Sequence, residues 1–235
     1  MKKIFFIVLV SVMSSVVMFS QDDAGGDTFR NTLNLGQVSN EQPANATFAI
    51  SYIAPSSIDG SKYLYDDWKN VGVLETGKNK KYRIENLNYD VERDAFVSKI
   101  SKDSVLVFNT VNFKKIVINN KNFKVVDKVN ENGMMFMEVV GEADSFSLLK
   151  DYKLTIREGV FSPTKGKGND EYVISYKYYV QRNGQITAIK FKKSELLKIF
   201  GSKADQIKSF AKKNRLSFNK DKDVKRMFLY LNKIS

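Results

Sequence analysis

The chain has 235 residues, of which 38 are Lys or Arg and 26 are Asp or Glu, and its formal net charge is +12. It contains no Cys and no His. These absences exclude disulfide bonds, thiolate or imidazole metal ligands, and catalysis by Ser-His-Asp or Cys-His groups. We therefore expect a protein that is not an enzyme, with no cofactor, no metal site and no catalytic residue.

The first twenty residues have the pattern of a secretory signal peptide. Lys2 and Lys3 precede an apolar stretch, 4–19, that only three Ser interrupt, and the small Ser20 precedes Gln21. An uncleaved anchor is the alternative, but the stretch is shorter than the roughly 20 residues that a spanning helix needs. We predict cleavage near residue 20, export to the periplasm or the outer-membrane periphery, and no membrane span in the mature chain.

The next segment, 21–60, is rich in Asp, Asn, Gln, Gly and Ser and predicts a flexible leader. Ordered structure should begin near 48–53 or near Tyr63. Residues 61–192 predict an antiparallel β domain, because short runs of Val, Ile, Phe and Tyr alternate with turn residues. Without helical crossovers, the strands should follow a meander, either open or curved into a partial barrel. The predicted strands are 71–76, 80–88, 94–100, 104–109, 112–118, 122–127, 134–141, 145–149, 152–158, 171–182 and 185–192.

Asn183-Gly184 is the clearest hairpin signal, because both residues tolerate the positive φ of a type I′ turn. This turn sets a register that pairs Tyr178 with Ile189 and Tyr176 with Phe191. The same register places Lys177 opposite Lys190, unless acids on a neighbouring strand relieve the repulsion. Period-two alternation then predicts one apolar face, formed by Tyr172, Ile174, Tyr176, Tyr178, Ile189 and Phe191.

A second hairpin spans 113–127 and has two possible turns. If Asn120 and Lys121 are central, Ile118 pairs with Phe123. A turn centred on Asn119-Asn120 is the alternative, since Asn is also favoured there.

The last segment, 193–235, predicts short helices. Ser194 could cap a helix over 195–200 that ends at Gly201, and Ser202 with Asp205 resembles a capping box for a helix ending near Asn214. A last helix should follow Asp221. Two apolar stripes, one of Ala204, Ile207, Phe210 and Ala211 and one of Val224, Met227, Phe228 and Leu231, should pack on the sheet. The predicted fold is thus α+β and mainly β, an antiparallel meander sheet followed by a small helical segment.

Positive charge is concentrated at the C-terminal end. Residues 21–184 have a net charge of zero, whereas 185–235 have a net charge of +10. Such a segment attracts anionic partners, and in an exported protein these are anionic lipid, lipopolysaccharide or an acidic envelope protein, with no nucleic acid expected. The alternative is that these side chains only solvate the helices. The candidate contacts are Lys203, Lys208, Lys212, Lys213, Lys222, Lys225 and Arg226.

Two acidic clusters are candidates for catalytic groups. Asp66-Asp67 beside Trp68 is typical of sugar-binding sites, but adjacent strand residues point to opposite faces, so we expect a turn cap and an aromatic anchor. Around Arg93, Glu92 and Asp94 predict a local ion pair in a turn.

Three segments carry a resemblance that covers about three quarters of the chain. They are YLYDDWKNVGV at 63–73, KYRIENLNYD at 81–90 and LLKIFGSKADQIKSFAKKNRLSFNKDKDVKRMFLYLN at 196–232. In these segments the chain resembles exported β-rich proteins of unknown function in Bacteroidota, although its leader is longer. The resemblance implies an envelope location and a β-rich fold, and it transfers no catalytic residues.

Three functional hypotheses follow. The first is a non-enzymatic envelope protein that binds a partner through its surface. The second is a periplasmic carrier of lipid or lipoprotein, with an open-barrel cavity lined by Tyr, Phe and Met, for which Met134, Met135 and Met137 are candidates. The third is a hydrolase, which would need two carboxylates about 5–10 Å apart in a cleft.

Overall fold

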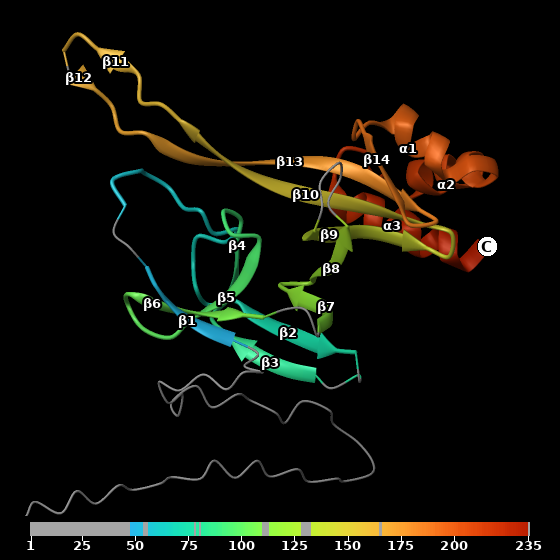
Figure 1. Ribbon diagram of the computed structural model, residues 1–235. Helices are drawn as coiled ribbons and strands as arrows, with labels where there is room; N and C mark the ends of the chain where they lie inside the picture. Colours follow the sequence, from blue (N-terminus) through green and yellow to red (C-terminus); the bar gives the residue numbers. More distant parts are fainter. Residues whose placement is uncertain are drawn as a thin grey trace, which may run out of the picture.

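The computed structural model describes residues 48–53, 56–77, 79, 81–109, 113–127, 133–164 and 166–234. The predicted signal peptide and most of the predicted leader, residues 1–47, lie outside this part of the chain. Within it, no helix is both long and apolar enough to cross a bilayer. The fold is mainly β, with antiparallel sheets and C-terminal helices, as predicted (Figure 1).

A large antiparallel sheet of eight strands organises the molecule, and neighbours along the chain are largely neighbours in space, as in the predicted meander. Its edges are not paired with each other, so the sheet is open. In spatial order its strands are β14 (Gln185–Ile189), β13 (Glu171–Arg182), β10 (Phe146–Arg157), β9 (Met134–Ala143), β8 (Lys121–Asp127), β7 (Phe113–Ile118), β2 (Val71–Thr76) and β3 (Lys81–Glu85).

A second sheet interrupts the meander. Asn86 adopts a φ of 54°, and this left-handed residue divides the predicted strand 80–88 between the two sheets. Ordered structure begins near 48–53, the first of the two predicted positions, because residues 48–52 form a strand that pairs along its whole length with 104–108. In spatial order the strands of this small sheet are β1 (Phe48–Tyr52), β6 (Ser104–Phe108), β5 (Ala95–Lys99) and β4 (Leu87–Asp90).

The first core fills the space between the two sheets. Phe96 lies edge-on to both Phe123 and Phe136, with ring centroids 5.2 and 4.9 Å apart, and Tyr89 contacts Phe96 and Phe123. Phe96, Phe123 and Tyr89 are almost completely buried. Aromatic pairs of this geometry add about 0.5–1.5 kcal/mol each to the burial of their apolar surface.

The strands β10 and β13 continue beyond their neighbours as a long arm (Figure 1). The predicted strands 145–149 and 152–158 are one strand, because both polar residues at the predicted break, Lys150 and Asp151, have ion-pair partners. The arm ends in a small hairpin of β11 (Phe161–Ser162) and β12 (Gly166–Lys167).

The predicted register of the Asn183-Gly184 hairpin is confirmed where the two strands pair, because Tyr178 lies opposite Ile189. Because β14 ends at Ile189, Phe191 does not pair with Tyr176 but stacks on Tyr178 with ring centroids 3.9 Å apart. Tyr176 is 54% exposed, so its predicted burial was wrong. Lys177 faces Asp151 of β10 instead of Lys190, which replaces the predicted repulsion by an attraction.

The β7–β8 hairpin adopts the alternative turn. Asn119 and Asn120 both have positive φ, 47° and 65°, and Ile118 pairs with Lys121. The preferred register was therefore wrong by two residues. A shift of two residues leaves the faces of a strand unchanged, so Ile116, Ile118 and Phe123 are still buried in the first core.

The helical segment comprises α1 (Lys193–Phe200), a 3₁₀ turn at Gly201–Lys203, α2 (Ala204–Lys213) and α3 (Asp221–Ile234). The predicted caps were wrong, because Ser194 lies inside α1 and no side chain caps α1 or α2. Gly201 and Asn214 end their helices as predicted. The apolar stripe of α3 is fully buried, and that of α2 is buried at Ile207 and Ala211, in a second core against β9, β10 and β13.

Close contact between β9 and α3 depends on a glycine. A Cβ built on Gly141 would lie 2.3 Å from a ring carbon of the buried Phe228, so α3 sits directly on the backbone of β9.

We expect Gly141→Ala to lower the free energy of unfolding by about 1–3 kcal/mol through overpacking, although Ala is ordinarily favoured over Gly inside a strand. Urea unfolding measures the change. Gly77→Ala is the control, because a Cβ there meets nothing within 4 Å and should change stability by less than about 0.5 kcal/mol. Equal effects of the two substitutions would contradict the close contact.

Candidate functional site: a basic helical face and a carboxylate cleft

The outer face of the helical segment is basic, because the apolar stripes face the sheet. We define the basic face as those predicted contact residues that are exposed and that form no ion pair with any described residue. These are Lys208, Lys212, Lys213, Lys222 and Arg226.

The other two predicted contact residues are held by backbone carbonyls. Lys203 donates to Ile234 over 2.8 Å, and Lys225 donates to Asn120 over 3.1 Å. Each of these hydrogen bonds fixes a helix to another part of the fold.

Most acids of this segment are turned inward or paired. Glu195 pairs with Lys198 at 3.1 Å, and the Asp223 carboxylate accepts the backbone N–H of Ser217. Asp221 faces the sheet, which leaves Asp205 as the exposed acid of the described helices that no ion pair engages. The positive charge of the surface is therefore not neutralised by the residues that share its helices.

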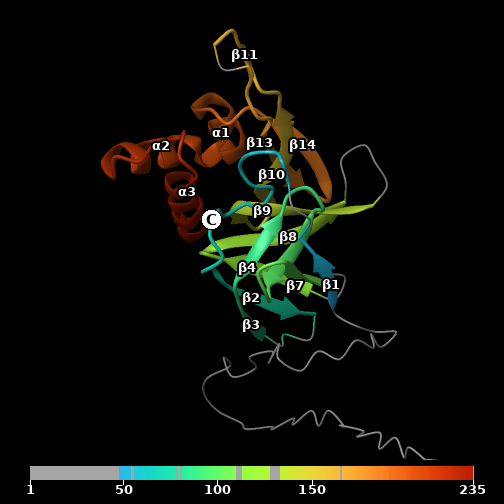
Figure 2. The same cartoon turned by 90° about the vertical axis from the view of Figure 1, so that its left-hand side faces the viewer.

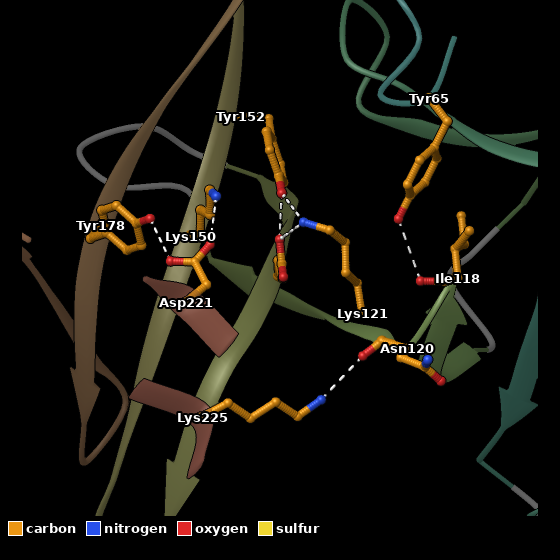
Figure 3. A network of polar contacts seen from close by, with 10 residues as sticks. Tyr65, Ile118, Asn120, Lys121, Lys150, Tyr152, Tyr178, Asp221 and Lys225 are labelled. Carbon is orange, nitrogen blue, oxygen red and sulfur yellow. Dashed lines mark hydrogen bonds and ion pairs between the residues drawn. The ribbon is translucent and has the colours of Figure 1, made fainter. Parts of the chain in front are cut away.

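The helices are fixed to the sheet by a buried polar cluster (Figure 3). Asp221, in the first turn of α3, accepts hydrogen bonds from Lys150 at 2.7 Å and from the hydroxyl of Tyr178 at 2.6 Å. The ammonium of Lys150 also lies 4.0 Å from the ring centroid of Tyr176. Burial, followed by the hydrogen bond to Asp221, raises the pKa of Tyr178, so its hydroxyl remains a donor.

A second cluster lies nearby on the large sheet (Figure 3). Lys121 contacts the carboxylate of Glu138 at 2.8 Å and the hydroxyl of Tyr152 at 2.7 Å, and Tyr152 donates to Glu138. Burial and the charge of Glu138 raise the pKa of Tyr152. All three side chains have partners within the cluster, which is the usual state of a structural network.

A cleft of about 750 Å³ lies where β9 and β10 separate. The two strands pair only as far as Glu138 and Lys150, after which 134–137 pair with β8 alone and 151–157 with β13 alone. The cleft lining combines carboxyl groups with aromatic and aliphatic side chains. Its residues include Tyr89, Asp94, Met135, Asp151, Tyr152, Leu154, Ile156, Tyr172 and Tyr179.

Two carboxyl groups in this cleft have raised pKa values. Asp94 accepts the hydroxyl of Tyr89 at 2.5 Å and the backbone N–H of Phe136 at 3.1 Å, which lower its pKa, but burial outweighs both and the charge of Asp151 adds to the rise. Burial also raises the pKa of Asp151, against the lowering effect of Lys153, 3.3 Å away. Raised carboxyl pKa values in a cleft are compatible with ligand binding and also with a purely structural role.

Asp151→Asn tests this shift through stability. The folded pKa of Asp151 lies above its unfolded value of about 3.9, so ionisation of Asp151 destabilises the fold as pH rises through the folded pKa. We expect the stability of the variant relative to the wild type to increase with pH, by at most about 1.4 kcal/mol per pH unit.

Urea unfolding between pH 4 and 7 measures this difference. Asp170→Asn is the control, because the hydrogen bond from Gly159 lowers the pKa of Asp170. Its titration therefore lies below this range, and the stability of Asp170→Asn relative to the wild type should change little between pH 4 and 7. A difference for Asp151→Asn that does not change with pH would contradict the raised pKa.

The predicted acidic clusters have structural roles. Asp67 caps a turn by accepting the backbone N–H of Lys69, and Trp68 packs edge-on against Tyr63 at 4.7 Å, both as expected. Arg93 forms a local ion pair as predicted, but its partner is Asp90 and neither of the flanking acids.

Within that turn, Glu92 pairs with Lys62, Arg93 lies 3.8 Å from Asp90, and Asp94 turns into the cleft. Sequence reasoning missed Asp94 and Asp151 as a pair, since 57 positions of sequence separate them. The available signal was an acid at a predicted strand break, Asp151.

Among the described residues, no group of three or more carboxylates is placed to hold a metal ion. Searches for relatives of this chain found no matching protein family, no matching curated protein and no matching solved structure.

Proposed function

We propose that this chain is an exported, non-enzymatic binding module of the cell envelope, which docks on an anionic lipid surface through the basic face. The proposal rests on how charged side chains are distributed over the helices. Their apolar stripes are largely buried, most of their acids are paired or turned inward, and the five cations of the basic face are exposed without an ion-pair partner among the described residues.

The electrostatic field of the basic face is strong enough to give measurable binding to an acidic bilayer. A Lys or Arg near an acidic bilayer contributes roughly 1 kcal/mol of binding free energy. Three or four engaged residues would therefore give binding in the range that vesicle assays measure. Because exposed charges are screened over about 10 Å at 0.1 M salt, the interaction should be strongly salt-dependent.

An anionic lipid surface is the partner that the predicted export favours. Phospholipid phosphates and lipopolysaccharide share the chemistry that a cluster of Lys and Arg recognises, and either is found in an envelope. An acidic envelope protein would present carboxylates instead.

The test uses the mature chain, residues 21–235, and vesicles that contain either neutral lipid alone or one quarter anionic lipid. We expect co-sedimentation with the anionic vesicles at low salt, little with neutral vesicles, and release as salt is raised. Binding that salt does not weaken, or equal binding to both kinds of vesicle, would overturn the proposal. Binding to an acidic envelope protein without binding to vesicles would also overturn it.

The cleft supports a second candidate, the periplasmic carrier of a lipid or other small ligand. Its lining places Met135, Leu154, Ile156 and several Tyr side chains around about 750 Å³ of space. Extraction of the purified chain with organic solvent, followed by mass spectrometry, tests this candidate. A bound lipid in stoichiometric amount supports the carrier, whereas an empty extract from protein purified without detergent contradicts it.

A further inference from the structure

The hairpin at the end of the β10–β13 arm exposes two large apolar side chains that are adjacent in the sequence. Val160 is 83% and Phe161 is 70% exposed, and these are the highest exposures among the exposed large apolar residues of the described chain. Neither belongs to any of the three apolar cores. Exposure of this kind in adjacent residues marks a contact site more often than isolated exposure does.

The tip is nevertheless held in a fixed shape. Phe161 pairs with Lys167 and Ser162 with Gly166, and Gly168 donates its backbone N–H to Val160 over 3.1 Å. At its base the two strands approach so closely that a Cβ on Gly159 would lie 1.8 Å from the carbonyl oxygen of Gly168. The chain therefore presents Val160 and Phe161 on an ordered support.

Ion pairs neutralise two of the acids near this support. Arg157 pairs with Glu171 across the arm, and Lys167 lies 3.5 Å from Asp170. Each pair reduces the repulsion that a carboxylate near the tip would experience at an anionic surface. Glu158, two residues before Val160, is exposed and forms no ion pair with a described residue.

The tip and the helices lie on the side of the molecule away from β3, as Figures 1 and 2 both show. Figure 1 also shows that they lie at opposite ends of the β10–β13 ribbon, because the helices pack near Phe146 and Val180 whereas the tip follows Arg157. A surface that contacts both must therefore extend along this ribbon.

We propose that the tip, defined as Val160 and Phe161, inserts into the headgroup and upper acyl region of the anionic bilayer on which the basic face docks. This inference rests on the proposed function and adds a second, apolar contact to it. Electrostatic attraction brings the helices to the surface, and the tip then transfers its side chains from water to lipid. The two contacts differ in their response to salt, because only the first is screened.

A single introduced cysteine reports on insertion directly, since the natural chain has none. Val160→Cys is labelled with an environment-sensitive fluorophore such as NBD and mixed with vesicles that contain one quarter anionic lipid. We expect the emission to increase several-fold and to shift to the blue. The matched control is labelled Tyr52→Cys, because Tyr52 is 61% exposed on β1 of the small sheet, and its emission should not change.

An unlabelled pair of variants removes any contribution of the fluorophore. Phe161→Ser should weaken vesicle binding about tenfold or more, because the free energy of transferring one Phe side chain from water into lipid is lost. The dependence of binding on salt should not change. Tyr52→Ser should bind as the wild type does.

Each outcome separates the two proposals. Vesicle binding with unchanged Val160→Cys emission and unchanged affinity of Phe161→Ser would overturn insertion and leave docking by the basic face intact. Failure of the wild type to bind anionic vesicles would overturn both.

Discussion

Reversing the charge of the basic face should weaken binding to anionic vesicles at least a hundredfold. Each replaced cation loses roughly 1 kcal/mol of attraction and adds repulsion, so even three engaged positions exceed this factor. Binding is measured by co-sedimentation at low salt. The variant carries Lys208→Glu, Lys212→Glu, Lys213→Glu, Lys222→Glu and Arg226→Glu.

A control of equal net charge separates a local effect from a general one. It reverses five exposed cations outside the helical segment, and its net charge equals that of the first variant. We expect it to bind within about threefold of the wild type, since these side chains lie far from the helices in sequence and on other strands and loops. Equal weakening by both variants would show that only the total charge matters and would contradict docking by the helices. The control substitutions are Lys69→Glu, Arg83→Glu, Lys102→Glu, Lys114→Glu and Lys115→Glu.

Asp221→Ala should lower the free energy of unfolding by about 2–4 kcal/mol. The side chain of Lys150 is only 8% exposed, and Asp221 is its carboxylate partner at 2.7 Å. Removal of Asp221 leaves a buried ammonium without a counter-charge and leaves the hydroxyl of Tyr178 without its acceptor. We expect this loss of stability to be smaller than the loss on breaking a fully buried ion pair, because Asp221 itself is 28% exposed.

Two further variants identify the cause of this loss, which urea unfolding measures. Asp205→Ala removes an acid from the first turn of α2 but breaks no ion pair, so it should cost less than about 1 kcal/mol. Adding Lys150→Met to Asp221→Ala should restore at least half of the lost stability, because it removes the unpaired charge. A double variant as unstable as Asp221→Ala alone would show that the ion pair does not fix α3 to the sheet.

Sequence patterns correctly predicted the structural elements that depend on residues only a few positions apart. The Asn183-Gly184 turn fixed its own register, and the stripe of Val224, Met227, Phe228 and Leu231 identified the buried side of α3. The predicted strand boundaries were wrong where a contact with a residue far away in the sequence determined them. Lys150 looks like a break in a strand until Asp221, 71 positions away in the sequence, is seen beside it.

The candidate sites also differ in how far the sequence predicts them. The basic face follows from the charge of 185–235, which is a property of composition, although only the structure shows that Lys203 and Lys225 are held by backbone carbonyls. The cleft could not be predicted, because Asp94 and Asp151 meet only where β9 separates from β10. The exposed tip was likewise hidden, since Val160 and Phe161 look like core residues in the sequence.

The sequence by itself determined the chemistry that this protein lacks, the antiparallel character of its strands and the location of its positive charge. These properties depend on which residues are present and on their spacing over a few positions. Tertiary structure alone decided which sheet each strand joined, which acids were turned away from the surface, and which apolar side chains stayed outside every core. The reason is that burial and ion pairing depend on distances between residues far apart in the chain, and such distances exist only once the chain has folded.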